Sequence, residues 1–194
     1  KIRAGMADLR MLMLRHGVTT TADMATGLFA GFDVEAGLIR SAFEAPGCAA
    51  RIDLVPMANE LDKVSDLDAW HTAARGRVEG GHVRLPRRVK LFADGAYFGQ
   101  NMRMNPPGYA DGHLGKWITE PTDFTRQVRR YWEAGFSLHI HVNGDEGLDV
   151  VLNTLEPVIT GQRSARQTVT LEHLGYSTEA QNRRIARLGI SVSG

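Results

Sequence analysis

The sequence lacks the features of a secreted, membrane-spanning or nucleic-acid-binding protein. A single cysteine, Cys48, excludes a disulfide within the chain and fits a reducing compartment. No apolar run approaches the roughly 20 residues that a membrane helix needs, and residues 1–10 lack the apolar stretch of a signal peptide. The formal net charge is only +1, and no basic block is interleaved with aromatic residues. We therefore expect a cytoplasmic protein that binds neither membranes nor nucleic acids.

The chain of 194 residues suffices for one domain of generous size or for a piece of a larger one. It begins at Lys1 without a methionine and enters an amphipathic helical pattern almost at once. It stops at Gly194, just after the start of an expected strand. We predict a single domain over 1–194 that is a fragment of a longer protein.

Helical and strand patterns alternate along the chain. Apolar stripes at helical spacing predict helices, and short β-branched runs predict strands. The expected helices span 6–15, 34–45, 67–77, 122–134, 147–155 and 178–188, and the expected strands span 18–24, 51–57, 88–93, 136–142, 167–172 and 189–193. Such alternation with short links predicts a parallel sheet with right-handed crossovers.

Six such strands fit an open doubly wound sheet or part of a (β/α)8 barrel. No Gly-x-Gly-x-x-Gly pattern follows the first strand, so a dinucleotide site has no support. Unusual polar residues collect where strands end, as in barrel enzymes. We predict an α/β fold, a partial (β/α)8 TIM barrel. The irregular segment 96–121 is long enough to be a lid or a binding loop.

Two histidines lie in the strand 136–142. His139 and His141 are two residues apart, so their side chains point to the same face. They are either packed core residues or ligands, and this segment alone favours neither. Asn143-Gly144-Asp145 follows, where we expect Asp145 to be the N-cap of the next helix, as we expect Thr122 to be for the helix before.

Other polar residues also lie in or at the ends of strands. Lys90 lies within an expected strand, and Asp23, Glu172 and His173 end two others. A lysine facing a barrel interior is costly unless it is neutralised, paired or chemically altered. Histidines on successive strands together with a carboxylated lysine would suit a zinc site. A salt-bridged lysine, with structural roles for the other three, is the competing interpretation.

Four segments together resemble one family: 17–23, 89–95, 135–145 and 171–173. In order and spacing they are similar to the amidohydrolase superfamily, in its amidohydrolase-3 (YtcJ-like, exoenzyme-regulatory-protein-like) branch, over nearly the whole chain. The resemblance implies a (β/α)8 barrel of the metal-dependent hydrolase type. It also implies one or two divalent metals, normally Zn²⁺ with Mn²⁺ or Fe²⁺ as alternatives, that activate water to hydrolyse C–N bonds of small molecules.

Carried over by position, the resemblance makes His141, His173 and a carboxylated Lys90 the catalytic metal ligands. It makes His139 a residue that supports the ligand or contacts substrate. The loop supplies further substrate-binding candidates, namely Tyr97, Arg103 and Trp117. The family's first-strand His-x-His pair and eighth-strand aspartate are absent from this chain, so we expect about strands two to seven of the barrel, inactive as given.

The leading hypothesis is therefore a zinc-dependent amidohydrolase that cleaves a non-peptide, amide-type bond of a small molecule. A truncated or degenerate homologue with a binding or regulatory role is the alternative. A third reading is an open-sheet binding protein without metal, in which Lys90, His141 and His173 would lie apart. Substrate, metal number and oligomeric state, a homo-oligomer included, stay open.

Overall fold

A computed structural model of the protein describes residues 2–161 and 166–194. The backbone divides into two compact units, one up to Arg88 and one from Val89 onward. Each unit contains its own sheet, and each sheet has parallel strand pairs. The predicted boundary of one domain over 1–194 stays a prediction, and the units are described one at a time.

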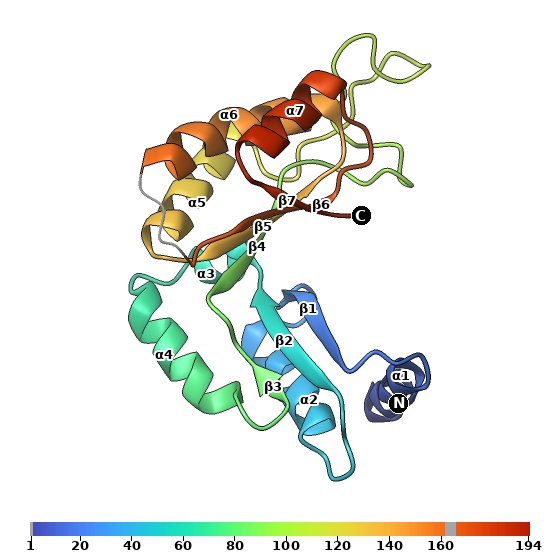
Figure 1. The fold of residues 1–194 in the computed structure, drawn as a ribbon, viewed down its shortest axis with the longest axis vertical. Coiled ribbons are helices and arrows are strands. Elements are labelled where there is room, and N and C mark those ends of the chain that lie inside the picture. Colours follow the sequence, from blue (N-terminus) through green and yellow to red (C-terminus); the bar gives the residue numbers. More distant parts are fainter. Residues whose placement is uncertain (1, 162–165) are drawn as a thin grey trace. The chain divides into compact units, whose positions relative to one another are not determined.

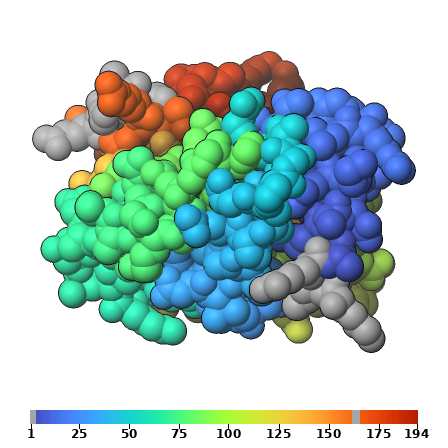
Figure 2. All heavy atoms as spheres, turned by 90° about the horizontal axis from the view of Figure 1, so that it is seen from below, coloured from blue at the N-terminus to red at the C-terminus, as the bar shows by residue number. Residues whose placement is uncertain are grey.

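The first unit is a three-stranded sheet with helices (Figure 1). Its elements in chain order are α1 (Ile2–Arg15), β1 (Thr20–Thr26), α2 (Phe32–Phe43), β2 (Arg51–Pro56), α3 (Ala58–Leu61), α4 (Leu67–Val78) and β3 (Val83–Arg84). The strand order is β1-β2-β3. Helix α2 buries Ala36, Ile39 and Phe43 at helical spacing in the same core as Ile52 and Leu54 of β2. Figure 2 shows α2 in the middle of the visible face of this unit, with α4 on one side and α1 on the other.

The second unit is a four-stranded sheet with three helices. Its elements are β4 (Arg88–Phe92), α5 (Pro121–Glu133), β5 (Ser137–Val142), α6 (Asp145–Gly161), β6 (Val169–His173), α7 (Glu179–Arg187) and β7 (Ser191–Ser193). The strand order is β4-β5-β6-β7. The three helices lie on one side of this sheet, and the long segment between β4 and α5 loops out beyond the strands (Figure 1).

The register of β5 on β6 separates an apolar face from a polar one. Ile140 is paired with Leu171, and both side chains are fully buried. His141 is paired with Glu172. Because successive side chains of a strand alternate in direction, His139, His141 and Glu172 share the other face. The helices cover the apolar face, so the polar face is left for chemistry.

The sequence predictions of helix and strand are largely confirmed, with ends shifted by a few residues. The structure adds two short elements that the patterns did not predict, α3 and β3. Helix α6 is longer than the predicted 147–155, because it continues past Pro157 to Gly161 and buries Ile159. Here the packing of an apolar face outweighs the helix-breaking tendency of proline.

Two predicted helix caps are wrong. Asp145 is the first residue of α6 and not its N-cap, and its carboxylate accepts the backbone N–H of Glu146 at 3.0 Å. Thr122 lies inside α5, which begins at Pro121 after the cap residue Glu120. Proline suits that first position because its missing N–H would have no partner within the helix.

Candidate functional site

Lys90 lies in the middle of β4 and is only 4% exposed. Its Nζ lies over the ring of Phe92, 5.3 Å from the ring centroid. Burial lowers the pKa of Lys90 from 10.5 to about 8, and the carboxylate of Glu172 opposes this shift. A minor but appreciable fraction of the amine, roughly a tenth, is therefore uncharged at pH 7.

His141 and His173 lie edge to face, with ring centroids 4.7 Å apart and an interplanar angle of 71°. Burial lowers the pKa of His141 to about 4, and the nearby His173 and Lys90 lower it further while a contact with the Gly95 carbonyl opposes them. Removal from water and then Lys90 also lower the pKa of His173. Both imidazoles are thus kept neutral, the form in which histidine binds a cation.

The position of the His173 ring depends on an unusual backbone conformation. In the register of the sheet, His173 is paired with Val142, so regular strand geometry would direct its side chain to the face opposite His141. The φ angle of His173 is instead +78°, and that of Leu174 is +48°. Left-handed conformations of residues other than glycine are costly and often occur at functional sites. This turn brings the His173 ring against the His141 ring.

His139 contacts a carboxylate on the same face. Its Nδ1–H donates to Oε1 of Glu172 at 2.7 Å, and both side chains are largely buried. His139 thus lies on β5, and His173 ends the neighbouring strand β6. Its predicted role as a substrate contact stays a prediction.

Asp94 follows β4, and its hydrogen bonds tie the end of this strand to the long segment before α5 and to the turn after β5. Its carboxylate accepts the backbone N–H groups of Arg103, Asn143 and Gly144 at 2.7 to 2.8 Å. Burial raises the pKa of Asp94, and these hydrogen bonds offset part of the rise. Gly144 is needed here, since a Cβ on it would lie 1.9 Å from the carbonyl oxygen of Arg103. The start of the long segment is thereby fixed against the end of β5.

The three loop residues predicted to bind substrate lie in different settings. The Arg103 guanidinium lies 5.3 Å from the Trp117 ring centroid and forms an ion pair with Glu146, with Nε and Oε2 2.7 Å apart. Trp117 forms a bridge with Asp94, next to the end of β4. Tyr97 is 65% exposed. The structure therefore brings Arg103 and Trp117 together and leaves Tyr97 facing solvent.

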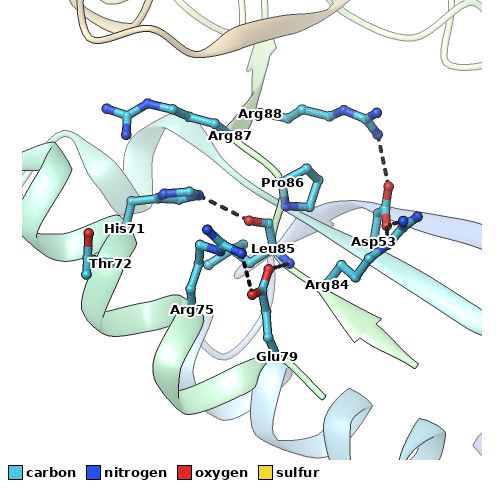
Figure 3. A pocket seen from close by; sticks show the side chains of 10 residues that line it. All are labelled: Asp53, His71, Thr72, Arg75, Glu79, Arg84, Leu85, Pro86, Arg87 and Arg88. Atoms are coloured by element: carbon cyan, nitrogen blue, oxygen red, sulfur yellow. Dashed lines mark hydrogen bonds and ion pairs between the residues drawn. The ribbon is translucent and has the colours of Figure 1, made fainter. Parts of the chain in front are cut away.

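Several charged and polar side chains of the first unit contact one another through ion pairs and hydrogen bonds. A hollow of about 650 Å³ is lined by His71 and several arginines (Figure 3). Asp53 accepts from Arg84 at 2.9 Å and from Arg88 at 3.2 Å. The His71 ring contacts the carbonyl oxygen of Leu85 at 3.1 Å. Asp23, also in this unit, accepts the hydroxyl of Thr26 at 2.8 Å.

The sequence did not reveal several residues that shape the second unit's site. Asn143 contacts the His141 ring, and Asn105 donates its backbone and side-chain N–H groups to Asp145. The turn sequence 143–145 after a histidine-bearing strand was the available signal. Within the described residues, no group of three or more His, Cys, Asp or Glu side chains is arranged to hold a metal ion, and no helix is long and apolar enough to cross a membrane.

The comparisons with known proteins agree with the resemblance. The model of the amidohydrolase-3 group, described as "Amidohydrolase family", matches residues 2–193. The chain belongs to the amidohydrolase family. No curated protein matches this amidohydrolase chain significantly.

Two solved structures resemble this amidohydrolase chain in fold. One is described as an uncharacterized metal-dependent hydrolase from Pyrococcus horikoshii OT3, with a TM-score of 0.72 and 20% identity, covering 96% of this chain and 35% of that one. The other has the same description and comes from Pyrococcus furiosus, with a TM-score of 0.70 and 21% identity over 96% of this chain and 36% of that one. The chain thus spans about a third of these proteins. The predicted α/β class with parallel sheets is confirmed, and the coverage agrees with a partial barrel.

Proposed function

We propose that this chain carries part of the centre of a metal-dependent hydrolase that cleaves an amide-type C–N bond of a small molecule. His141, His173 and a carboxylated Lys90 are the residues assigned to hold the metal. The family membership supports the class of reaction, and Zn²⁺ is the proposed ion, because imidazole nitrogen and carboxylate oxygen are ligands that zinc favours.

The observation that carries the proposal is the pairing of two neutral imidazoles beside a buried lysine. The His141 and His173 rings are 4.7 Å apart, and both respond to the charge of Lys90. Two imidazoles this close can share one cation, so the donor set fits the proposed group. The third reading of the sequence would have these residues lie apart, and the contact between the two rings supports the first reading instead.

Lys90 is suited to become an anionic ligand. With a pKa of about 8, part of its amine is uncharged at neutral pH. The amine nitrogen can then attack carbon dioxide, forming an N–C bond and releasing one proton, so that a carbamate anion replaces a cation. This reaction turns a costly buried charge into an oxygen donor.

The remaining side chains hold and surround the reacting groups. A divalent cation bound there would lower the pKa of a water molecule and polarise a substrate carbonyl. The His139–Glu172 pair lies on the same sheet face and is proposed to line the substrate pocket. Arg103, Trp117 and Tyr97 are proposed to form a wall of the substrate pocket.

Metal content of the full-length protein tests the proposal. We expect bound zinc, manganese or iron, and we expect His141→Ala and His173→Ala to lose it together with hydrolysis of amide-type test substrates. His16→Ala is the matched control, because His16 is exposed and lies in the first unit. A protein without these metals, in which His141→Ala leaves the metal content unchanged, would contradict the proposal.

A binding or regulatory role without catalysis is the second candidate. Full-length protein that folds, binds no metal and still recognises a small molecule would support it. The cytoplasmic location and a homo-oligomeric state stay predictions.

A further inference from the structure

Asn143 is a polar residue, only 3% exposed, at the end of β5. Its side-chain Nδ2 lies 3.1 Å from the carbonyl oxygen of Gly95 and 3.1 Å from Nε2 of His141. Nε2 of His141 is in turn 3.3 Å from the same Gly95 oxygen. These atoms form a nearly equilateral triangle with one acceptor, the carbonyl, at one corner.

The geometry of this triangle favours one tautomer of His141. The angle between the two N–H bonds of a planar carboxamide is much wider than the angle that the Gly95 oxygen and the His141 nitrogen make at Nδ2. Asn143 therefore cannot donate well to both neighbours. A carbonyl oxygen has two lone pairs and can accept from both nitrogens. Asn143 therefore donates to Gly95, and His141 donates its Nε2–H to the same oxygen. Nδ1 is left as the ring nitrogen with a lone pair.

The backbone of Asn143 links this arrangement to the second histidine. Its N–H donates to Oδ1 of Asp94 at 2.8 Å, and its carbonyl accepts the N–H of Tyr176 at 2.7 Å. Tyr176 lies in the turn that begins at His173. A Cβ built on Gly175 would lie 3.0 Å from Oδ1 of Asn143, so this turn packs closely against the side chain. Asn143 thus contacts the supports of both imidazoles.

We propose that Asn143 is a positioning residue that holds the Gly95 carbonyl as the hydrogen-bond acceptor for His141, so that the ring presents Nδ1 to the metal. The inference rests on the proposed function. Metal-binding histidines generally donate their second ring N–H to such an acceptor, which fixes the tautomer and the orientation of the ring. The sequence of this chain supplies the acceptor from a backbone carbonyl 46 residues away.

The tautomer of His141 is the direct test. In metal-free full-length protein labelled with ¹⁵N, we expect the imidazole NMR signals of His141 to show the proton on Nε2. In Asn143→Ala we expect both tautomers to be populated, and Zn²⁺ affinity to fall about 10- to 100-fold. Asn143→Leu should behave like Asn143→Ala, because it fills the space but cannot donate.

Asn153→Ala is the matched control, since Asn153 lies on α6 and its carboxamide oxygen accepts from Arg184 outside the site. It should leave the tautomer unchanged and Zn²⁺ affinity within twofold. The proposal is overturned if wild-type His141 carries its proton on Nδ1, or if Asn143→Leu retains wild-type affinity. If the wild type binds no Zn²⁺, the proposed function fails, while the tautomer still decides the role of Asn143. Should the variants not fold, a wild-type proton on Nδ1 would still overturn the proposal.

Discussion

In the unit that ends at Arg88, Asp53 lies between two guanidinium groups, whereas in the unit that begins at Val89 the buried Lys90 lies over the ring of Phe92. Asp53 is thus matched by opposite charge at hydrogen-bond distance. The carboxylate to which Lys90 responds, that of Glu172, is occupied by His139. Removing one partner of a matched pair of charges is costly to the fold, whereas a buried amine with a strongly lowered pKa is a candidate for chemistry.

Two carboxylates, Glu44 in the first unit and Asp94 in the second, show a similar contrast although each accepts three backbone N–H groups. Glu44 of the first unit accepts the backbone N–H groups of Gly81, His82 and Val83, as Asp94 of the second unit accepts three others. Burial acts to raise both pKa values. The hydrogen bonds outweigh it at Glu44, whose pKa is lowered, but not at the fully buried Asp94, whose pKa is raised. Burial, and not the number of donors, decides the direction.

Replacing Lys90 by methionine should have the largest effect on this contrast. The fall of its pKa from 10.5 to about 8, at about 1.4 kcal/mol for each pKa unit, corresponds to a cost of about 3 kcal/mol at pH 7. Lys90→Met should raise the free energy of unfolding by up to that amount, while abolishing metal-dependent turnover. Chemical denaturation in bicarbonate-free buffer measures the gain.

The pH dependence gives the control for Lys90. The cost is present below pH 8 and disappears as the pH rises towards 10.5, because the unfolded chain then holds the proton that the folded protein has already lost. Wild-type stability should therefore approach that of Lys90→Met in this range. A variant less stable than the wild type at pH 7 would show that the lysine charge is matched after all.

Replacing Asp53 by asparagine should have the opposite sign and a smaller size. Arg84 and Arg88 would lose their shared counter-charge, and we expect a loss of about 1–2 kcal/mol in the free energy of unfolding. Asp33→Asn is the matched control, because the Asp33–Arg77 pair is largely exposed and should contribute less than about 1 kcal/mol. Equal effects of the two substitutions in thermal and chemical denaturation would show that Asp53 is no better matched than an exposed ion pair.

Glu44→Gln should produce the smallest change, about 1 kcal/mol at pH 7. A carboxyl whose pKa is lowered by folding stabilises the protein above its unfolded value of 4.5, and this contribution is lost as the pH falls through the folded pKa. When the pH is lowered from 7 to below 4.5, the free energy of unfolding should therefore fall less in the variant than in the wild type. Asp94, with its raised pKa, contributes in the opposite direction. Denaturation curves of Glu44→Gln that stay parallel to the wild type throughout would contradict this account.

Much of the fold could be predicted from the sequence, because apolar residues repeat about every 3.6 residues in helices and every 2 residues in strands, and this spacing is a local property. The helices and strands of more than a few residues were all predicted, and the segment between β4 and α5 was recognised as irregular. Short elements such as β3 (Val83–Arg84) were missed, because two residues carry no period. The caps at Asp145 and Thr122 failed because the start of a helix depends on backbone angles, which propensities predict only to within a few residues.

By itself the sequence determined which residues could do chemistry, namely Lys90, His139, His141 and His173, because a lysine or histidine within an apolar strand is conspicuous in any fold. Only the tertiary structure decided how they meet. The left-handed backbone of His173 turns its ring to His141, and Asn143 holds the Gly95 carbonyl beside that ring. Such contacts join residues tens of positions apart, and they depend on strand register and turn geometry, which local patterns do not encode.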